Sequence, residues 1–198
     1  MAKQVTKKKP QKTTRPVKRP VKTAASIVTA PTSALSHSAG AQRLWAVGLG
    51  LVVLLFDQLS KNWALMALES QNIDVIDGWL QWALAFNRGA SFSMLADWTY
   101  APYKLTLLAI VAVGLIWWWL GKPESKLCVA GLGLVLGGAV GNMVDRLQYG
   151  AVVDFIRVYH DTWAFPTFNV ADSAITVGVI FILLDAIITT WHAWKKGR

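Results

Sequence analysis

Cysteine and histidine are nearly absent from the sequence. Its 198 residues include one cysteine, Cys128, and three histidines. A single cysteine cannot form a disulfide within the chain or a multi-thiolate metal cluster. His37, His160 and His192 are scattered and match no recognised spacing of metal ligands. Any hydrolytic chemistry must therefore use other residue types, and we expect no metal ion or other cofactor.

Charged residues are also scarce, at 16% of the chain, whereas hydrophobic residues make up 54%. A soluble domain of this size would struggle to cover so much apolar surface. The net charge of +9 comes from residues 1–40, which contain nine Lys and Arg and no acid. Because this segment has few large apolar side chains, we predict a disordered basic tail. Beside a membrane segment such a tail favours anionic headgroups, and we expect no nucleic-acid partner.

Four apolar runs are long enough to cross the hydrocarbon core of a bilayer as helices. A cleavable signal peptide is disfavoured, because the first run follows a long basic segment and carries two charged residues. The sequence predicts an all-α integral membrane protein whose membrane domain covers residues 41–198. The predicted transmembrane helices are about residues 44–65, 105–121, 127–144 and 172–191.

The distribution of basic residues predicts the orientation in the membrane. Ten lie before the first run, two in the short connection between the second and third runs, and three at the C-terminus. The positive-inside rule therefore places both termini in the cytoplasm. The two longer connections, residues 66–104 and 145–171, then face the outer side of the membrane, which in a bacterium is the periplasm.

Both outer connections contain residues that are typical of strands. The segment DVIDGWLQWALAFNRGASFSML (74–95) has two short extended runs separated by Asn, Arg and Gly, and AVVDFIRVYHDTWAF (151–165) is rich in β-branched and aromatic residues. We predict a small extended or β element that lies across the outer membrane surface, with its tryptophans at interfacial depth.

Charged residues within membrane spans need a partner or a function. Asp57 and Lys61 are four residues apart on one helical face, which predicts an ion pair. Ser60 next to Lys61 is a poor candidate for a Ser/Lys dyad, because adjacent helical residues diverge by about 100°. For Asp185 we expect a packing or interfacial role. The glycines of the third span predict close helix packing.

At the outer end of the third span, Asn142 and Asp145 share a helical face, and Arg146 follows directly. These groups could pair internally or hydrogen-bond an extended peptide backbone. The residues alone leave both interpretations open.

Two carboxylates remain, Asp154 and Asp172, and both can reach the outer face. Two carboxylates that share a site cannot both ionise cheaply, so one keeps a proton while the other acts as a base that activates water. Asn169 is a predicted N-cap that places Asp172 in the first helical turn, where the helix dipole favours a charge on Asp172. Plain helix capping explains the same spacing, so the residues leave two interpretations open, catalysis by this pair and a purely structural cap.

Five segments, taken together and in order, resemble the lipoprotein signal peptidase family, also called signal peptidase II. These membrane aspartic peptidases cleave bacterial prolipoproteins. The resemblance extends from about residue 44 to residue 191. The segments are DQLSK (57–61), FNRGASFSML (86–95), GGAVGNMVDR (137–146), GAVVDFI (150–156) and FNVADSAITVG (168–178).

The resemblance implies that Asp154 and Asp172 are the catalytic aspartates and flank a water that attacks the bond before a diacylglyceryl-modified cysteine. It also implies prolipoprotein substrates, contact with membrane lipids, an inner-membrane location and inhibition by globomycin-type cyclic peptides. For Asp57 and Lys61 it leaves supporting roles and substrate contact open. The residues that it places around the substrate backbone and the catalytic pair are Asn87, Asn142 and Arg146, and Gly89 and Ala90 belong to the same outer-loop motif as Asn87. Asp145 and Asn169 are further candidates for a binding or supporting role.

Two alternatives belong to other functional classes. In a small transporter or proton-conducting protein, Asp57, Lys61 and Asp185 would form a relay within the membrane. In an inert lipoprotein-binding relative no catalytic pair would be needed, and the presence of both Asp154 and Asp172 argues against it.

Overall fold

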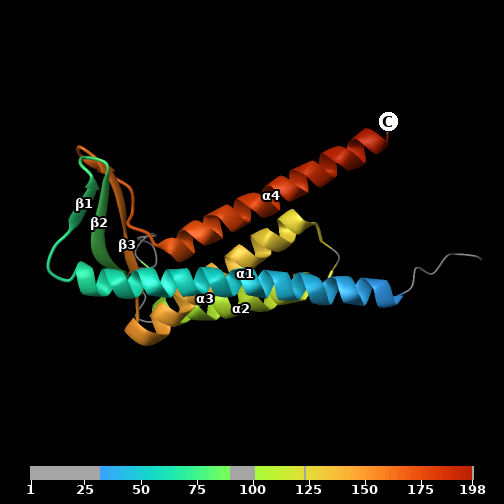
Figure 1. Ribbon diagram of the computed structural model, residues 1–198, viewed down its shortest axis with the longest axis horizontal. Helices are drawn as coiled ribbons and strands as arrows, with labels where there is room; N and C mark the ends of the chain where they lie inside the picture. Colours follow the sequence, from blue (N-terminus) through green and yellow to red (C-terminus); the bar gives the residue numbers. More distant parts are fainter. Residues whose placement is uncertain (1–31, 90–100, 123, 198) are drawn as a thin grey trace, which may run out of the picture. The chain divides into compact units, whose positions relative to one another are not determined.

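The computed structural model describes residues 32–89, 101–122 and 124–197 (Figure 1). In this part of the chain, four helices each contain a stretch that is long and apolar enough to cross a membrane, and a small sheet accompanies them. The predicted fold class is confirmed. The elements are α1 (Thr32–Ala67), β1 (Ile73–Ile76), β2 (Leu80–Asn87), α2 (Ala101–Trp119), α3 (Lys126–Tyr149), β3 (Val152–His160), β4 (Trp163–Ala164) and α4 (Val170–Lys196).

Helix α1 begins earlier than predicted, at Thr32. The predicted disordered tail reached residue 40, so its last part is helical in the structure, whereas residues 1–31 lie outside the described residues. The segment from residue 32 to residue 41 contains three alanines and no proline. Because each residue added to an existing helix adds one backbone hydrogen bond, the apolar segment extends readily into this alanine-containing stretch.

Helix α3 packs against α1, α2 and α4. Glycines let two of these neighbours approach its backbone closely. A methyl group at Gly137 would meet the carbonyl oxygen of Gly50 in α1, and one at Gly138 would meet the carbonyl oxygen of Ala171 in α4. Small residues are the usual means of close packing between membrane helices. The packing role predicted for the glycines of the third span is confirmed.

The sheet is antiparallel, with the strand order β1-β2-β3-β4, and the strands gather at one end of the helices (Figure 1). Residues 77–79 form the turn between β1 and β2. We predicted that residues 87–89 separate two extended runs. In the structure the first of these runs already forms the whole β1–β2 hairpin, and residues 87–89 lie at its end. The second predicted extended run, residues 90–95, lies outside the described residues.

Aromatic rings hold the sheet against the end of α1. Trp63 of α1 contacts Trp82 of β2 and Phe155 of β3 edge to face, with ring centroids 6.2 and 6.3 Å apart. Ala64 and Leu68 are buried in the same cluster. Such aromatic contacts contribute beyond the apolar area that they bury. The sheet therefore has a fixed position relative to the helices that carry the polar residues.

Two local features bring β3 beside the start of α4. Gly150 ends α3 in the left-handed conformation, with φ of 66°, so the chain reverses at once into β3. Before α4, Phe168 pairs with Ile156 through N–H to carbonyl hydrogen bonds of 2.8 and 3.0 Å. Asn169, which follows Phe168 and precedes α4, therefore lies directly alongside β3.

Replacement of Gly137 by alanine tests the close approach of α1 and α3. Gly137→Ala places a methyl group against the α1 backbone, and we expect a loss of about 1–3 kcal/mol of stability. Thermal unfolding in detergent measures it as a lower Tm. Gly114→Ala in α2 is the matched control, because a methyl group there meets nothing within 4 Å. A Tm for Gly137→Ala as high as that of the control would contradict the packing described.

Candidate active site

Asn169 is the N-cap of α4, as predicted, and forms a capping box with Asp172. The side-chain oxygen of Asn169 accepts a hydrogen bond of 2.9 Å from the backbone N–H of Asp172. In return, Oδ2 of Asp172 accepts one of 3.3 Å from the backbone N–H of Asn169. The capping box holds Asp172 in the first turn, where the helix dipole favours a negative charge.

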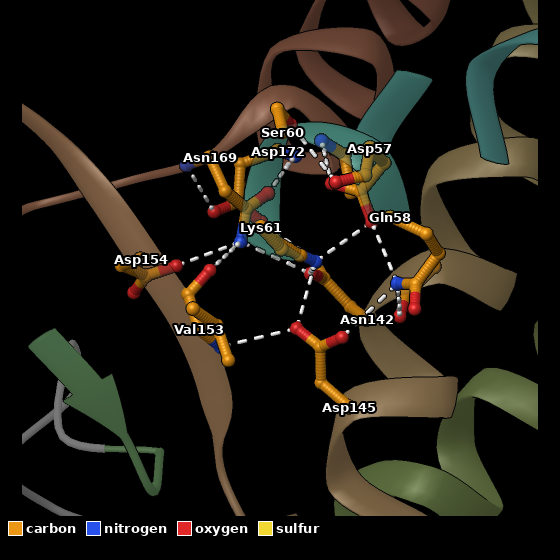
Figure 2. Close-up of polar contacts among 12 residues, drawn as sticks. Asp57, Gln58, Ser60, Lys61, Asn142, Asp145, Val153, Asp154, Asn169 and Asp172 are labelled. Carbon is orange, nitrogen blue, oxygen red and sulfur yellow. Dashed lines mark hydrogen bonds and ion pairs between the residues drawn. The ribbon is translucent and has the colours of Figure 1, made fainter. Parts of the chain in front are cut away.

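The amide of Asn169 also reaches the other aspartate. Its Nδ2 donates to Oδ1 of Asp154 at 2.7 Å and to the carbonyl oxygen of Val153 at 3.3 Å. Asn169 is completely buried, so these contacts determine how its amide is oriented. One side chain thus touches both Asp154 and the first turn that carries Asp172, and the two predicted carboxylates lie in one site (Figure 2).

Asp154 lies within β3, opposite Ala85 of β2, and only 1% of its surface is exposed. Burial and the neighbouring Asp172 carboxylate together raise the pKa of Asp154 to about 7. Hydrogen bonds from Asn87 and Asn169 and the charge of Lys61 lower the pKa in part. Desolvation outweighs them because a carboxylate loses more by leaving water than a few neutral donors return. Asp154 therefore holds its proton at mildly acidic pH, where an ordinary carboxyl group is ionised, and loses it as the pH rises through about 7.

Asp172 has a different environment, because it is only partly buried and is surrounded by donors. Nδ2 of Asn142 donates to Oδ1 of Asp172 at 2.7 Å, in addition to the backbone N–H of the capping box. Arg146 lies within electrostatic reach of both Asp172 and Asp154. Amide, guanidinium and backbone donors stabilise an ionised oxygen. The two carboxylates thus have unequal environments.

A cavity of about 720 Å³ adjoins the pair, and four predicted site residues line it: Asn87, Gly89, Arg146 and Asp172. Gly89 has φ of 106°, which glycine adopts without strain, and its N–H donates to Oδ1 of Asn87 at 2.9 Å. Asp154 is not among the described lining residues and lies deeper. The other lining residues are Leu105, Phe165, Pro166, Thr167, Phe168, Ser173, Thr176 and Val177.

The predicted pair of Asp57 and Lys61 belongs to a larger group of buried charges. Nζ of Lys61 lies 2.8 Å from Oδ2 of Asp57 and 2.8 Å from Oδ2 of Asp145. All three side chains are at most 2% exposed. We call Asp57, Lys61 and Asp145 the Lys61 cluster. The predicted ion pair is confirmed, and its second acid could not be inferred from spacing, because Asp145 comes from another helix.

Asn142 connects the Lys61 cluster to the aspartate pair. Its Oδ1 accepts hydrogen bonds from Lys61 at 3.1 Å and from Asn169 at 3.2 Å, which leaves Nδ2 for Asp172. Of the group left open between internal pairing and binding, Asn142 and Asp145 therefore pair internally. Arg146 differs, because it donates to the carbonyl oxygen of Asn142 at 3.3 Å and also lines the cavity.

Gln58 also contacts the Lys61 cluster and was not predicted from the sequence. Its Nε2 donates to Oδ2 of Asp57 at 3.2 Å and to Oδ1 of Asp145 at 3.1 Å. A polar amide within an apolar span, directly beside a charged residue, was the available signal. Two other residues lie apart from the pair: Ser60 donates to the backbone carbonyl of Asp57, and Asp185 accepts from Ser125.

Comparison with known proteins identifies the family. The family model described as "Signal peptidase (SPase) II" matches residues 49–188, which contain both aspartates and the whole Lys61 cluster. The chain belongs to the signal peptidase II family. Members of this family are aspartic peptidases, and the chain is therefore a peptidase that removes signal peptides from prolipoproteins.

Individual relatives agree with this assignment. The chain is 47% identical to the lipoprotein signal peptidase of Pseudomonas fluorescens strain Pf0-1 over 149 residues, 72% of this chain and 87% of the relative. It is 40% identical to that of Acinetobacter baylyi over 72% of this chain and 80% of the relative. A solved structure described as "Bacterial membrane enzyme structure by the in meso method at 2.3 A resolution" matches with a TM-score of 0.64 and 27% identity, covering 73% of this chain and 88% of the solved one.

The raised pKa of Asp154 predicts a pH-dependent effect of Asp154→Asn on stability. The folded protein holds this proton more tightly than the unfolded chain does, so the wild type loses stability as pH rises from about 4 to the folded pKa of about 7. Asparagine carries no charge and escapes this loss. We expect a higher Tm for Asp154→Asn than for wild type at pH 8, and a clearly smaller Tm difference at pH 5. A wild type that is the more stable protein at pH 8 would contradict this.

Proposed function

We propose that the chain hydrolyses the peptide bond before a diacylglyceryl-modified cysteine, and that Asp154 and Asp172 are its catalytic residues. The observation that carries this proposal is the convergence of the two carboxylates at Asn169, one deeply buried and one lining a cavity. An aspartic peptidase needs one neutral and one ionised carboxyl group around a single water. Unequal environments support that division.

In the proposed reaction, Asp172 is the base. It takes a proton from the attacking water, whose oxygen forms a bond to the carbonyl carbon of the scissile peptide. Asp154 gives its proton to the carbonyl oxygen, so that a neutral tetrahedral intermediate forms. As this intermediate collapses, the C–N bond breaks and Asp172 gives the proton that it took from water to the leaving nitrogen. One hydroxyl group of the intermediate returns its proton to Asp154 as it becomes the new carbonyl, so the pair again holds one proton.

Groups that line the cavity are suited to hold the substrate. Asn87 and Arg146 present polar groups beside Asp172, whereas Leu105, Phe165 and Val177 provide apolar wall. We propose that the polar groups bind the peptide backbone and that the acyl chains of the lipid remain in the hydrocarbon beside the apolar side. Lipid binding then contributes to positioning of the scissile bond and not to the chemical step.

The proposed location is the bacterial inner membrane, with both termini in the cytoplasm and the aspartates at the periplasmic face. Lys122 and Lys126, which flank the connection of α2 and α3, and Lys195 and Lys196 at the end of α4 support this orientation. Membrane lipids are then the surrounding partners. On the family resemblance we also propose inhibition by cyclic peptides of the globomycin type.

Cleavage of a diacylglyceryl-modified prolipoprotein by the purified protein tests the proposal. We expect Asp154→Asn and Asp172→Asn each to lower kcat by at least about 10²–10⁴-fold, because each removes one proton-transfer group. Mass spectrometry of the products identifies the bond that is cleaved.

Asp161→Asn is the matched control for this assay. Asp161 is an exposed acid in the turn after β3, and its φ of 48° is one that asparagine tolerates well. We expect wild-type cleavage from this variant. Undiminished cleavage by either Asp154→Asn or Asp172→Asn would refute the site, and equal cleavage of a precursor without the lipid would refute the proposed substrate.

A further inference from the structure

The Lys61 cluster lies close to the aspartate pair without contacting the cavity. Asp57, Lys61 and Asp145 are 0%, 2% and 1% exposed, and none of them is among the described residues that line the cavity. Charges buried this deeply are costly unless they have a structural or functional role. A direct contact with substrate therefore does not account for the cluster.

Each carboxylate of the cluster holds the backbone immediately before one aspartate of the pair. Oδ1 of Asp57 accepts a hydrogen bond of 2.9 Å from the N–H of Ala171, the residue before Asp172. Oδ2 of Asp145 accepts one of 3.0 Å from the N–H of Val153, the residue before Asp154. Both aspartate-bearing segments are thus anchored by equivalent contacts (Figure 2).

Lys61 joins these two anchors. Its ammonium group lies 2.8 Å from both carboxylates and 3.1 Å from Oδ1 of Asn142, whose amide group donates to Asp172. Without the ammonium, two carboxylates would face each other in a buried site and repel. The side chain of Lys61 therefore fixes the position of α3, β3 and α4 relative to one another at the point where they carry Asn142, Asp154 and Asp172.

We propose that the Lys61 cluster is a positioning clamp that sets the spacing of Asp154 and Asp172. This inference rests on the proposed function, because the spacing matters only if both carboxylates act on the same water. Reactions of this kind are sensitive to geometry, and a misplacement of about 1 Å can cost about 100-fold in rate. Asp57, Lys61 and Asp145 then affect kcat through the aspartate pair and leave substrate binding largely unchanged.

The two acids of the clamp are expected to respond differently to replacement by asparagine. Asp57 uses one oxygen for Ala171 and the other for Lys61. Asparagine has a single acceptor oxygen, so Asp57→Asn must lose one of these contacts. Asp145 uses the same oxygen, Oδ2, for both Val153 and Lys61. Asp145→Asn can therefore keep both contacts of the clamp, and only its contact with Gln58 is altered.

Steady-state kinetics with the lipid-modified prolipoprotein test this ordering on the full-length protein. We expect Asp57→Asn to lower kcat about 100-fold with KM within about 3-fold of wild type, and Asp145→Asn to lower kcat less than about 10-fold. Neither substitution leaves an uncompensated buried charge on Lys61, because one acid partner remains in each variant. Tm values measured alongside establish that each variant is folded at the assay temperature.

Asp185→Asn is the control, because Asp185 is an acid of a membrane-spanning helix that contacts Ser125 and not the clamp. We expect wild-type kcat and KM from it. Three results would each overturn the proposed clamp. They are a wild-type kcat in folded Asp57→Asn, a loss of kcat in Asp145→Asn as large as in Asp57→Asn, and a raised KM with unchanged kcat in Asp57→Asn. Asp154→Asn is assayed in parallel: if it is active, the proposed function itself fails, whereas inactive Asp154→Asn with active Asp57→Asn refutes the clamp alone.

Discussion

The geometry of the site formed by Asp154 and Asp172 depends on the ion pairs between Lys61 and two buried carboxylates. In the membrane an unpaired charge is costly, so Asp57 and Asp145 can be buried only with a cation between them. Once paired, their remaining lone pairs are free to accept backbone N–H groups from β3 and α4. These hydrogen bonds fix the positions of the segments that carry Asp154 and Asp172.

The two aspartates also differ in their environments, and this difference favours a different protonation state for each. Asp154 lies deep in β3, where burial favours the neutral acid, whereas Asp172 opens α4, where amide and backbone donors favour the charge. Asn169 touches both segments and is itself oriented by Asn142. Membership of the signal peptidase II family and this asymmetry together support a mechanism in which neither a metal ion nor a nucleophilic side chain is assigned a step.

Much of this architecture was predictable from local patterns. The apolar runs predicted the four membrane helices, the spacing of Asp57 and Lys61 predicted their ion pair, and Asn169 three residues before Asp172 predicted the cap. Contacts between distant segments were not predictable, because a single sequence does not show which residues of different helices and strands face one another. Asp145 as the second partner of Lys61 and the bridging amide of Gln58 are therefore visible only in the structure.

The pH dependence of kcat/KM for prolipoprotein cleavage tests whether an unequal pair of carboxylates shares one proton. Since the folded pKa of Asp154 is about 7, we expect a bell-shaped profile whose alkaline limb falls near pH 7, as Asp154 loses the proton that it must donate. A profile that stays flat between about pH 4 and pH 8 would contradict a shared-proton pair.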